Sequence, residues 1–214
     1  MAKQLAHQLQ VAYLDTGATY RMLAYAAMQR HLHPVADADR IAQLVRRLPM
    51  ALSVDDEGVV HVRLDGIDVS REIRTEEVTE TAALVTQHPS VRQALVRRQR
   101  ELASAHGVVV EGRDTGSVVF PRAPFKFFLT ASTEIRARRR QRELAQLYGS
   151  QTPIAQVNEQ LRFRDGLDRH RRVGPLVKPS GAITIDTTHR TVGQVVRAML
   201  THIRTQRVVR HRMR

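Results

Sequence analysis

The stretch VVVEGRDTGSVVFP, at 108–121, indicates both a place in a fold and a kind of ligand. Its three leading valines, followed by glycines, predict a fully buried strand that ends in a sharp turn. Gly112 and Gly116 leave the backbone free around Arg113 and Asp114, at the strand end where parallel sheets bind their ligands. A guanidinium group at that place suits a phosphate. The alternative is an Arg-Asp ion pair that only holds the loop together.

A second strand-to-turn pattern occurs near the N-terminus, in DTGATYR at 15–21. Residues 11–14 predict a buried strand and residues 18–30 a helix, so these polar side chains also lie where a strand ends. Parallel sheets collect ligand groups at this edge. By itself, Thr16 is better explained as a helix cap than as a ligand contact.

The remaining periodicities predict an α/β fold with one excursion. Alternating apolar residues over 50–70, with turns at 56–58 and 65–66, predict short antiparallel strands. The other predicted helices cover 1–9, 40–48, 90 to near 107, 133–147, 153–161 and 192–203, and the other predicted strands cover 125–129 and 183–185.

The composition describes one globular unit. The chain has 214 residues, of which 42% are hydrophobic, so it can bury a sizeable core. It contains no cysteine, which excludes disulfides, thiolate zinc sites and cysteine nucleophiles and is compatible with the cytoplasm. No apolar run has the length of a membrane helix, and residues 1–10 lack the centre of a signal peptide. We expect a cytoplasmic protein without a membrane partner.

The formal charge of +13 raises the hypothesis of a basic nucleic-acid-binding protein. Aromatic residues make up only 4% of the chain, so stacking platforms for bases are scarce. The arginines gather at 136–142, 162–172 and 204–214. The first and last groups are typical of solvated helix and tail surface. We therefore expect no dedicated nucleic-acid partner.

The middle group, RDGLDRHRR at 164–172, has a regular spacing. Arg164, Asp168 and Arg171 fall on one face at helical spacing. Ion pairs within one helix would explain that spacing without any ligand. The ten histidines form no zinc spacing.

Five motifs together resemble the bacterial cytidylate kinases, enzymes that phosphorylate CMP and dCMP. They occur in the order and spacing of that family, and the resemblance extends from residue 1 to about 205. The motifs are DTGATYR at 15–21, EIRTEEV at 72–78, PSVRQALVRRQR at 89–100, EGRDTGSVVFP at 111–121 and RDGLDRHRR at 164–172.

The resemblance implies an α/β fold of the P-loop nucleoside monophosphate kinase type. A parallel sheet flanked by helices would carry a small antiparallel β insert and a helical lid. The implied organisation is one kinase-like domain at 1–214, a monophosphate-binding insert at 44–84, a lid at 150–174 and a basic tail at 206–214. The family is usually monomeric, and we expect a monomer.

The resemblance also implies a site. Arg113, Arg164 and Arg171 would be catalytic, and Arg92 and Asp114 would read cytosine, whose amino donor and ring acceptors they complement. The implied substrate-binding residues are Thr16, Tyr20, Arg21, Arg92, Arg113, Asp114, Arg164, Asp168 and Arg171. No residue is expected to bind a metal directly, although Asp15 would reach a water on the Mg²⁺ that accompanies ATP. Ala83 departs from the family, which often has a serine there near the base.

One large piece of the family pattern is absent, because the sequence contains no GxxxxGK[ST]. In similar proteins a strand and this phosphate-binding loop come before the residues that match Ala2 and Lys3. Where Met1 stands the family often has valine, and a GTG codon encodes either valine or a bacterial start. We therefore expect the first strand and the P-loop to be missing, through a start assigned too late or through a real deletion.

The resemblance implies transfer of the γ-phosphoryl group of ATP to CMP or dCMP, giving CDP or dCDP. The alternatives are a truncated, catalytically impaired CMP-binding protein and the basic nucleic-acid-binding protein. The acceptor is already an anion, so positioning and charge neutralisation matter more than a strong base. Arg21, Arg113 and Arg171 would bind the phosphates and neutralise their charge.

Overall fold

A computed structural model of the chain describes residues 1–54, 60–103, 107–149 and 151–212. Its parallel strands form two separate pairs. Strand β1 (Ala12–Asp15) pairs with β5 (Val108–Glu111), and β6 (Phe127–Thr130) pairs with β7 (Ile183–Asp186). The α/β architecture is as predicted, but the continuous parallel sheet is not, because no described strand lies between β5 and β6.

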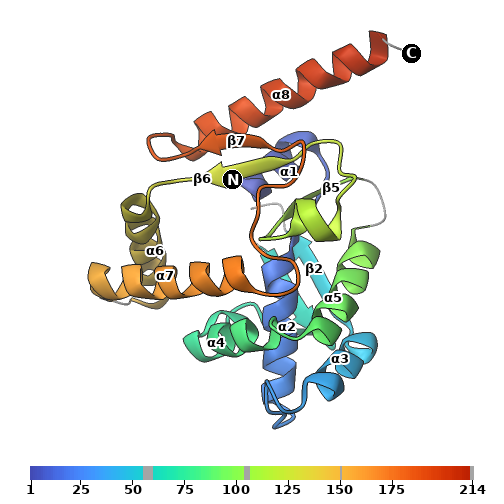
Figure 1. Cartoon of the computed structure of the whole chain (residues 1–214), viewed down its shortest axis with the longest axis vertical. Coiled ribbons are helices and arrows are strands. Elements are labelled where there is room, and N and C mark those ends of the chain that lie inside the picture. The colour runs from blue at the N-terminus through green and yellow to red at the C-terminus, as the bar shows by residue number, and fades with distance from the viewer. Residues whose placement is uncertain (55–59, 104–106, 150, 213–214) are drawn as a thin grey trace.

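Helices surround both pairs of strands (Figure 1). Helix α8 lies beside β6 and β7 at one end of the molecule, whereas α2 to α5 gather at the other. The helices are α1 (Ala2–Leu9), α2 (Thr16–Met28), α3 (Ala38–Arg47), α4 (Glu76–Val85), α5 (Pro89–Leu102), α6 (Thr133–Tyr148), α7 (Ile154–His170) and α8 (Val192–Arg212), with a 3₁₀ turn η1 (Glu72–Arg74) and a π-helical turn η2 (Thr115–Val119).

The predicted excursion is a three-stranded antiparallel sheet of β2 (Met50–Val54), β3 (Val60–Leu64) and β4 (Ile67–Asp68). Asp65 and Gly66 connect β3 to β4 with φ angles of 55° and 80°, which confirms the turn predicted there. The turn predicted at 56–58 lies outside the described residues.

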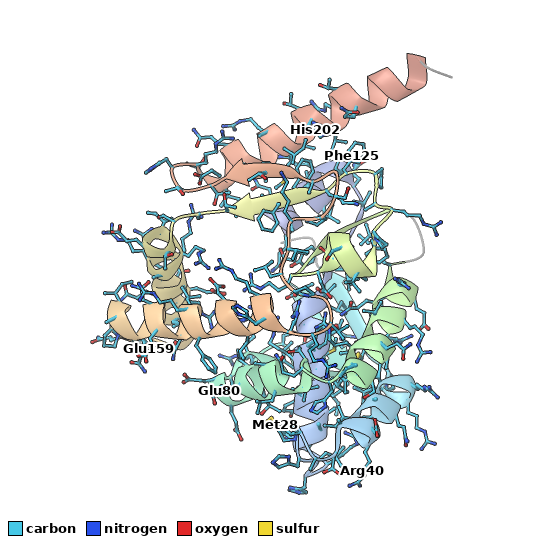
Figure 2. All side chains as sticks on the ribbon, viewed as in Figure 1. Met28, Arg40, Glu80, Phe125, Glu159 and His202 are labelled. Carbon is cyan, nitrogen blue, oxygen red and sulfur yellow. The ribbon has the colours of Figure 1, made fainter. Side chains whose placement is uncertain are left out.

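Two apolar cores hold the fold together. The larger core joins α2 to α3, α5 and the antiparallel sheet, and Met22, Leu23 and Leu95 in it are completely buried. The smaller core joins α1 and α8 to β7 through Leu5, Ile185 and Val195. In Figure 2, Phe125 and His202 lie together on the side of α8, and their rings meet edge to face with centroids 6.4 Å apart.

Strand β5 is less buried than its sequence predicts. Val108, Val109 and Val110 are half-buried, and all three line a cavity. A β-branched run is fully covered when a sheet continues on both sides of the strand, and β5 pairs on one side only among the described residues. The strand itself was predicted correctly, whereas its burial was not.

Two helix ends also differ from prediction. Arg171 follows the end of α7 with extended backbone, at φ −64° and ψ 142°, so it does not share a helical face with Arg164 and Asp168. Helix α8 continues to Arg212 and includes most of the segment 206–214 that we expected beyond it.

Candidate active site

A cavity of about 1610 Å³ opens at the carboxyl ends of β1 and β5. Residues from α2, the segment after β5 and α7 line it, although these elements are far apart in sequence. The predicted site residues on its wall are Thr16, Tyr20, Arg21, Arg113, Asp114, Arg164, Asp168 and Arg171. Arg92 is not on the wall, because its side chain is almost completely buried behind Asp114.

The turn after β1 is held by hydrogen bonds that differ from the prediction. Asp15, not Thr16, caps α2, because its carboxylate accepts from the Ala18 amide at 3.0 Å. The Thr16 hydroxyl donates instead to the backbone carbonyl of Glu111, at 2.8 Å. Arg21 donates to the other Asp15 oxygen at 2.8 Å, so the carboxylate orients the guanidinium group.

A buried ion pair lies at the inner wall of the cavity, where Asp114 lines the cavity and Arg92 lies behind it. Arg92 donates to Asp114, and both side chains have less than a tenth of their surface exposed. The guanidinium carbon of Arg92 lies 5.5 Å from the centre of the Tyr20 ring, a cation–π contact. Burial is the main reason why the pKa of Tyr20 is raised to about 12. The wall therefore presents a fixed carboxylate beside a neutral phenol.

Charges of alternating sign continue from this wall towards α7. Arg171 Nη2 lies 3.9 Å from Asp114 Oδ1, and Arg171 Nη1 lies 3.2 Å from Asp168 Oδ1. Asp168 Oδ2 meets Arg113 Nε at 2.9 Å. The pair of Arg171 and Asp168 is local, although Arg171 lies just beyond α7 and not within one helix as the spacing predicted. Asp168 also reaches across to the segment after β5. The end of α7 is thereby tied to that segment.

The arginines are crowded enough to perturb one another. Desolvation, and then the positive charge of Arg113, lower the pKa of Arg164, although part of its side chain is exposed to the cavity. Desolvation, and then Arg92, lower the pKa of Arg171. Guanidinium groups stay protonated in proteins in spite of such shifts. The cavity therefore holds excess positive charge that an anionic ligand would relieve.

Several buried donors here have no hydrogen-bond acceptor among the described residues. They are Arg92 Nε and Nη1, Arg171 Nη2 and the Tyr20 hydroxyl. Buried polar groups are nearly always paired, so the two of these residues that line the cavity, Tyr20 and Arg171, point to a ligand with acceptor atoms.

Some residues at the cavity were not singled out by the sequence. Tyr13 donates to the Glu111 carboxylate at 2.5 Å, and both line the cavity. Burial, and then Glu111, raise the pKa of Tyr13. The only sequence signal for this pair was its place near the ends of two predicted strands, with Tyr13 two residues before Asp15 and Glu111 directly before Gly112.

The arginine group at 136–142 is less solvated than predicted. Arg136 pairs with the buried Asp165 of α7 at 2.5 Å, and Arg139 donates to the hydroxyl and the carbonyl of Thr187. Arg140 lines the cavity. Helix α6 packs against α7 and against the turn after β7, which charge-run patterns do not show.

Within the parts of the chain that the structure describes, no group of three or more His, Cys, Asp or Glu side chains could hold a metal ion by itself. No helix among those residues has both the length and the apolar character that crossing a bilayer requires.

Comparison with known proteins agrees with this geometry. Residues 1–205 match the protein family described as cytidylate kinase. The chain belongs to the cytidylate kinase family. It is 40% identical over 203 residues to the cytidylate kinase of Desulforamulus reducens, covering 95% of this chain and 90% of that protein. It is 43% identical over 204 residues to that of Caldanaerobacter subterraneus subsp. tengcongensis, with 95% and 88% covered.

The cytidylate kinase of Salmonella typhimurium is 42% identical over 204 residues, again with 95% of this chain and 88% of the relative covered. The family match thus includes every motif of the cavity. It ends at residue 205, before the basic segment 206–214.

Proposed function

We propose that the chain transfers the γ-phosphoryl group of ATP to the 5′-phosphate of CMP or dCMP, giving ADP and CDP or dCDP. The observation that carries this proposal is the convergence of four arginines, from α2, from the segment after β5 and from α7 and its end, on one cavity. The four are Arg21, Arg113, Arg164 and Arg171. The relatives named above are cytidylate kinases, which supports this reaction.

In this proposal Arg21, Arg113 and Arg171 bind phosphates. Two polyanions repel each other, so the protein must bring them together and neutralise the equatorial oxygens of the transferred group. Arg164 lies within the electrostatic reach of Arg113 and Asp168, and it would join them when the nucleotide binds. Arg113, Arg164 and Arg171 are the proposed catalytic residues.

The cytosine would lie against the buried pair of Arg92 and Asp114. Asp114 Oδ2 is bound to Arg92, whereas Asp114 Oδ1 is 3.9 Å from Arg171 and retains room to accept from an amino group. Cytosine carries that donor and uracil carries an acceptor instead, so the carboxylate would favour CMP over UMP. Thr16 and Tyr20 would contact the same nucleotide, and Asp168 its sugar and base.

The ATP half of the site requires the strand and the glycine-rich loop that the resemblance implies. We infer that this strand would pair between β5 and β6, which both line the cavity and pair on one side only among the described residues. The loop would supply the backbone amides and the lysine that hold phosphates.

Mg²⁺ would accompany ATP. This ion prefers oxygen ligands and keeps several waters, usually on one or two carboxylates and the phosphates of the substrate. Asp15 and Glu111 are register partners at the ends of β1 and β5, and both line the cavity. These carboxylates fit a site that holds the ion through its water, and the ion would offset charge on the phosphates.

The remaining proposals concern the two segments beside the site, the location of the protein and its oligomeric state. We propose that α7 and its flanks at 150–174 act as a lid and that residues 44–84 act as the monophosphate-binding insert. Gln160 of α7 donates to Glu76 of α4 at 3.0 Å, a contact between these two segments. In Figure 2, Glu159 and Glu80 mark them on the same side of the molecule. We propose a cytoplasmic monomer with CMP or dCMP and ATP as its partners.

A CMP-binding protein without catalysis is the alternative, and the relatives named above do not favour it. Calorimetry with CMP and a coupled assay of ADP release separate the two. A kinase binds CMP and releases ADP, whereas the alternative only binds. Failure to bind CMP at all would refute both. The DNA upstream of Met1 shows whether a strand and a GxxxxGK[ST] are encoded there.

A further inference from the structure

Gln99 and Arg100 are neighbouring polar residues of α5. Arg100 contacts the segment 111–119 directly, and Gln99 contacts Thr19 of α2, which packs beside the start of that segment. Neither is among the proposed nucleotide ligands. Gln99 is completely buried, whereas Arg100 is exposed where it lines the cavity. A buried polar side chain costs free energy unless it is hydrogen bonded, so its partners indicate what it does.

Gln99 stands at one end of a chain of hydrogen bonds that reaches the start of that segment. Its Nε2 donates to the Thr19 hydroxyl at 2.8 Å, which donates to the Thr16 carbonyl at 2.7 Å. The Thr16 hydroxyl donates to the Glu111 carbonyl at 2.8 Å. The residue after Glu111 is Gly112, where a Cβ atom would overlap the Thr16 hydroxyl. The close contact of α2 with the end of β5 therefore needs a glycine there.

Arg100 holds the other end of the segment. Its Nε donates to the Val119 carbonyl at 2.8 Å, and its Nη2 donates to the Val118 carbonyl at 2.9 Å. These carbonyls belong to the end of the π-helical turn η2, where backbone acceptors lack partners within the turn. A planar guanidinium group can serve two such acceptors at once.

The middle of the segment is held from the same helix. Arg92 lies two helical turns before Gln99 and bonds Asp114. Helix α5 therefore fixes the start, the middle and the end of the segment. We propose that Gln99 and Arg100 are positioning residues that hold the segment 111–119 so that Arg113 and Asp114 meet the nucleotide. This rests on the proposed function, in which Asp114 reads cytosine and Arg113 binds phosphate.

The test compares Arg100→Met with Arg97→Met in the full chain. Methionine removes the donors of Arg100 and retains much of its length, and Arg97 is an exposed arginine on the same helix. Calorimetry measures the dissociation constants of CMP and UMP for each variant. We expect Arg100→Met to weaken CMP binding about tenfold and to reduce the preference for CMP over UMP. Arg97→Met should change neither value.

The ratio of the two affinities separates positioning from a loss of stability. Both nucleotides are measured on protein that circular dichroism shows to be folded, so general destabilisation leaves their ratio unchanged. Gln99→Met is the second variant, with the same expected direction. Arg100→Lys should recover part of the ratio, because a lysine keeps the charge without the planar pair of donors. An unchanged ratio in Arg100→Met overturns the proposal.

Hydrogen exchange keeps the test independent of the proposed function. If the unaltered chain binds neither nucleotide, the proposed function fails. The rate of hydrogen exchange of the amides at 111–119 then still tests whether the contacts from α5 hold this segment in place. Faster exchange there in Arg100→Met than in Arg97→Met would support them. Equal exchange in the two variants would overturn them.

Discussion

The two sides of the cavity are built differently. On the side of α2 and α5, charged and polar groups are buried and connected, as in the pair of Arg92 and Asp114. On the side of β5 and β6, the walls are half-buried apolar residues such as Val110 and Phe127. Buried charges are kept only where a function or a network requires them, and half-buried valines are typical of a strand that lacks a neighbour. In the proposed function the first side would bind the monophosphate, and the second side would lie beside ATP.

The largest expected effect comes from breaking the buried pair. Asp114→Ala leaves the Arg92 charge buried without its main partner, which should cost about 3–5 kcal/mol of the free energy of unfolding. Denaturant unfolding measures this loss, and calorimetry should show no CMP binding. The control is Glu101→Ala, because Glu101 forms an exposed pair with Arg98 that is worth at most about 1 kcal/mol. Equal losses in the two variants would contradict the comparison of the two sides.

Removal of a phosphate ligand should act on catalysis more than on stability. In a chain that releases ADP, Arg113→Ala should lower kcat by about 10²- to 10³-fold, which is the usual cost of one donor to the transition state. The side chain is 42% exposed, so the melting temperature should hardly change. Arg138→Ala on the exposed face of α6 is the matched control. Near-normal turnover in Arg113→Ala would count against its catalytic role.

The two sides should also differ in packing. Leu23→Ala removes a completely buried side chain and should destabilise the protein by about 2–5 kcal/mol. Val110→Ala on half-buried β5 should cost about 1 kcal/mol or less, because fewer contacts are lost. Thermal and denaturant unfolding of the two variants measure the difference. A loss of equal size for Val110→Ala would mean that β5 is already covered.

The smallest expected effect is a change of CMP affinity with pH. The arginines stay charged and the raised pKa of Tyr20, about 12, keeps its phenol neutral, so neither alters between pH 7 and 9. Below a pH of about 6 the phosphate of CMP takes up a proton and loses charge. Affinity should therefore be constant from pH 7 to 9 and fall by up to about tenfold at pH 5. Calorimetry at these pH values measures the CMP affinity, and a fall in that affinity between pH 7 and 9 would contradict the prediction.

Much of the fold was predictable because its signals are local. The strand at 108–111, the helix at 192–203 and the turn at 65–66 each follow from a few consecutive side chains. The errors have a common cause, since burial and capping depend on what lies beside an element. Thr16 has the chemistry of a cap, but the preceding Asp15 stands at the N-cap and accepts from the Ala18 amide, while the Thr16 hydroxyl donates to the Glu111 carbonyl on the neighbouring strand.

The family, the two strand-end motifs and the arginines that line the cavity were predictable from residue types and their spacing, without any contact being known. The packing of distant elements was needed to learn that Arg92 lies behind Asp114, that Arg171 follows the end of α7, and that α5 bonds the segment 111–119 through Arg92 and Arg100. These contacts join residues from different elements. Their geometry depends on how helices and strands pack, which no local pattern records.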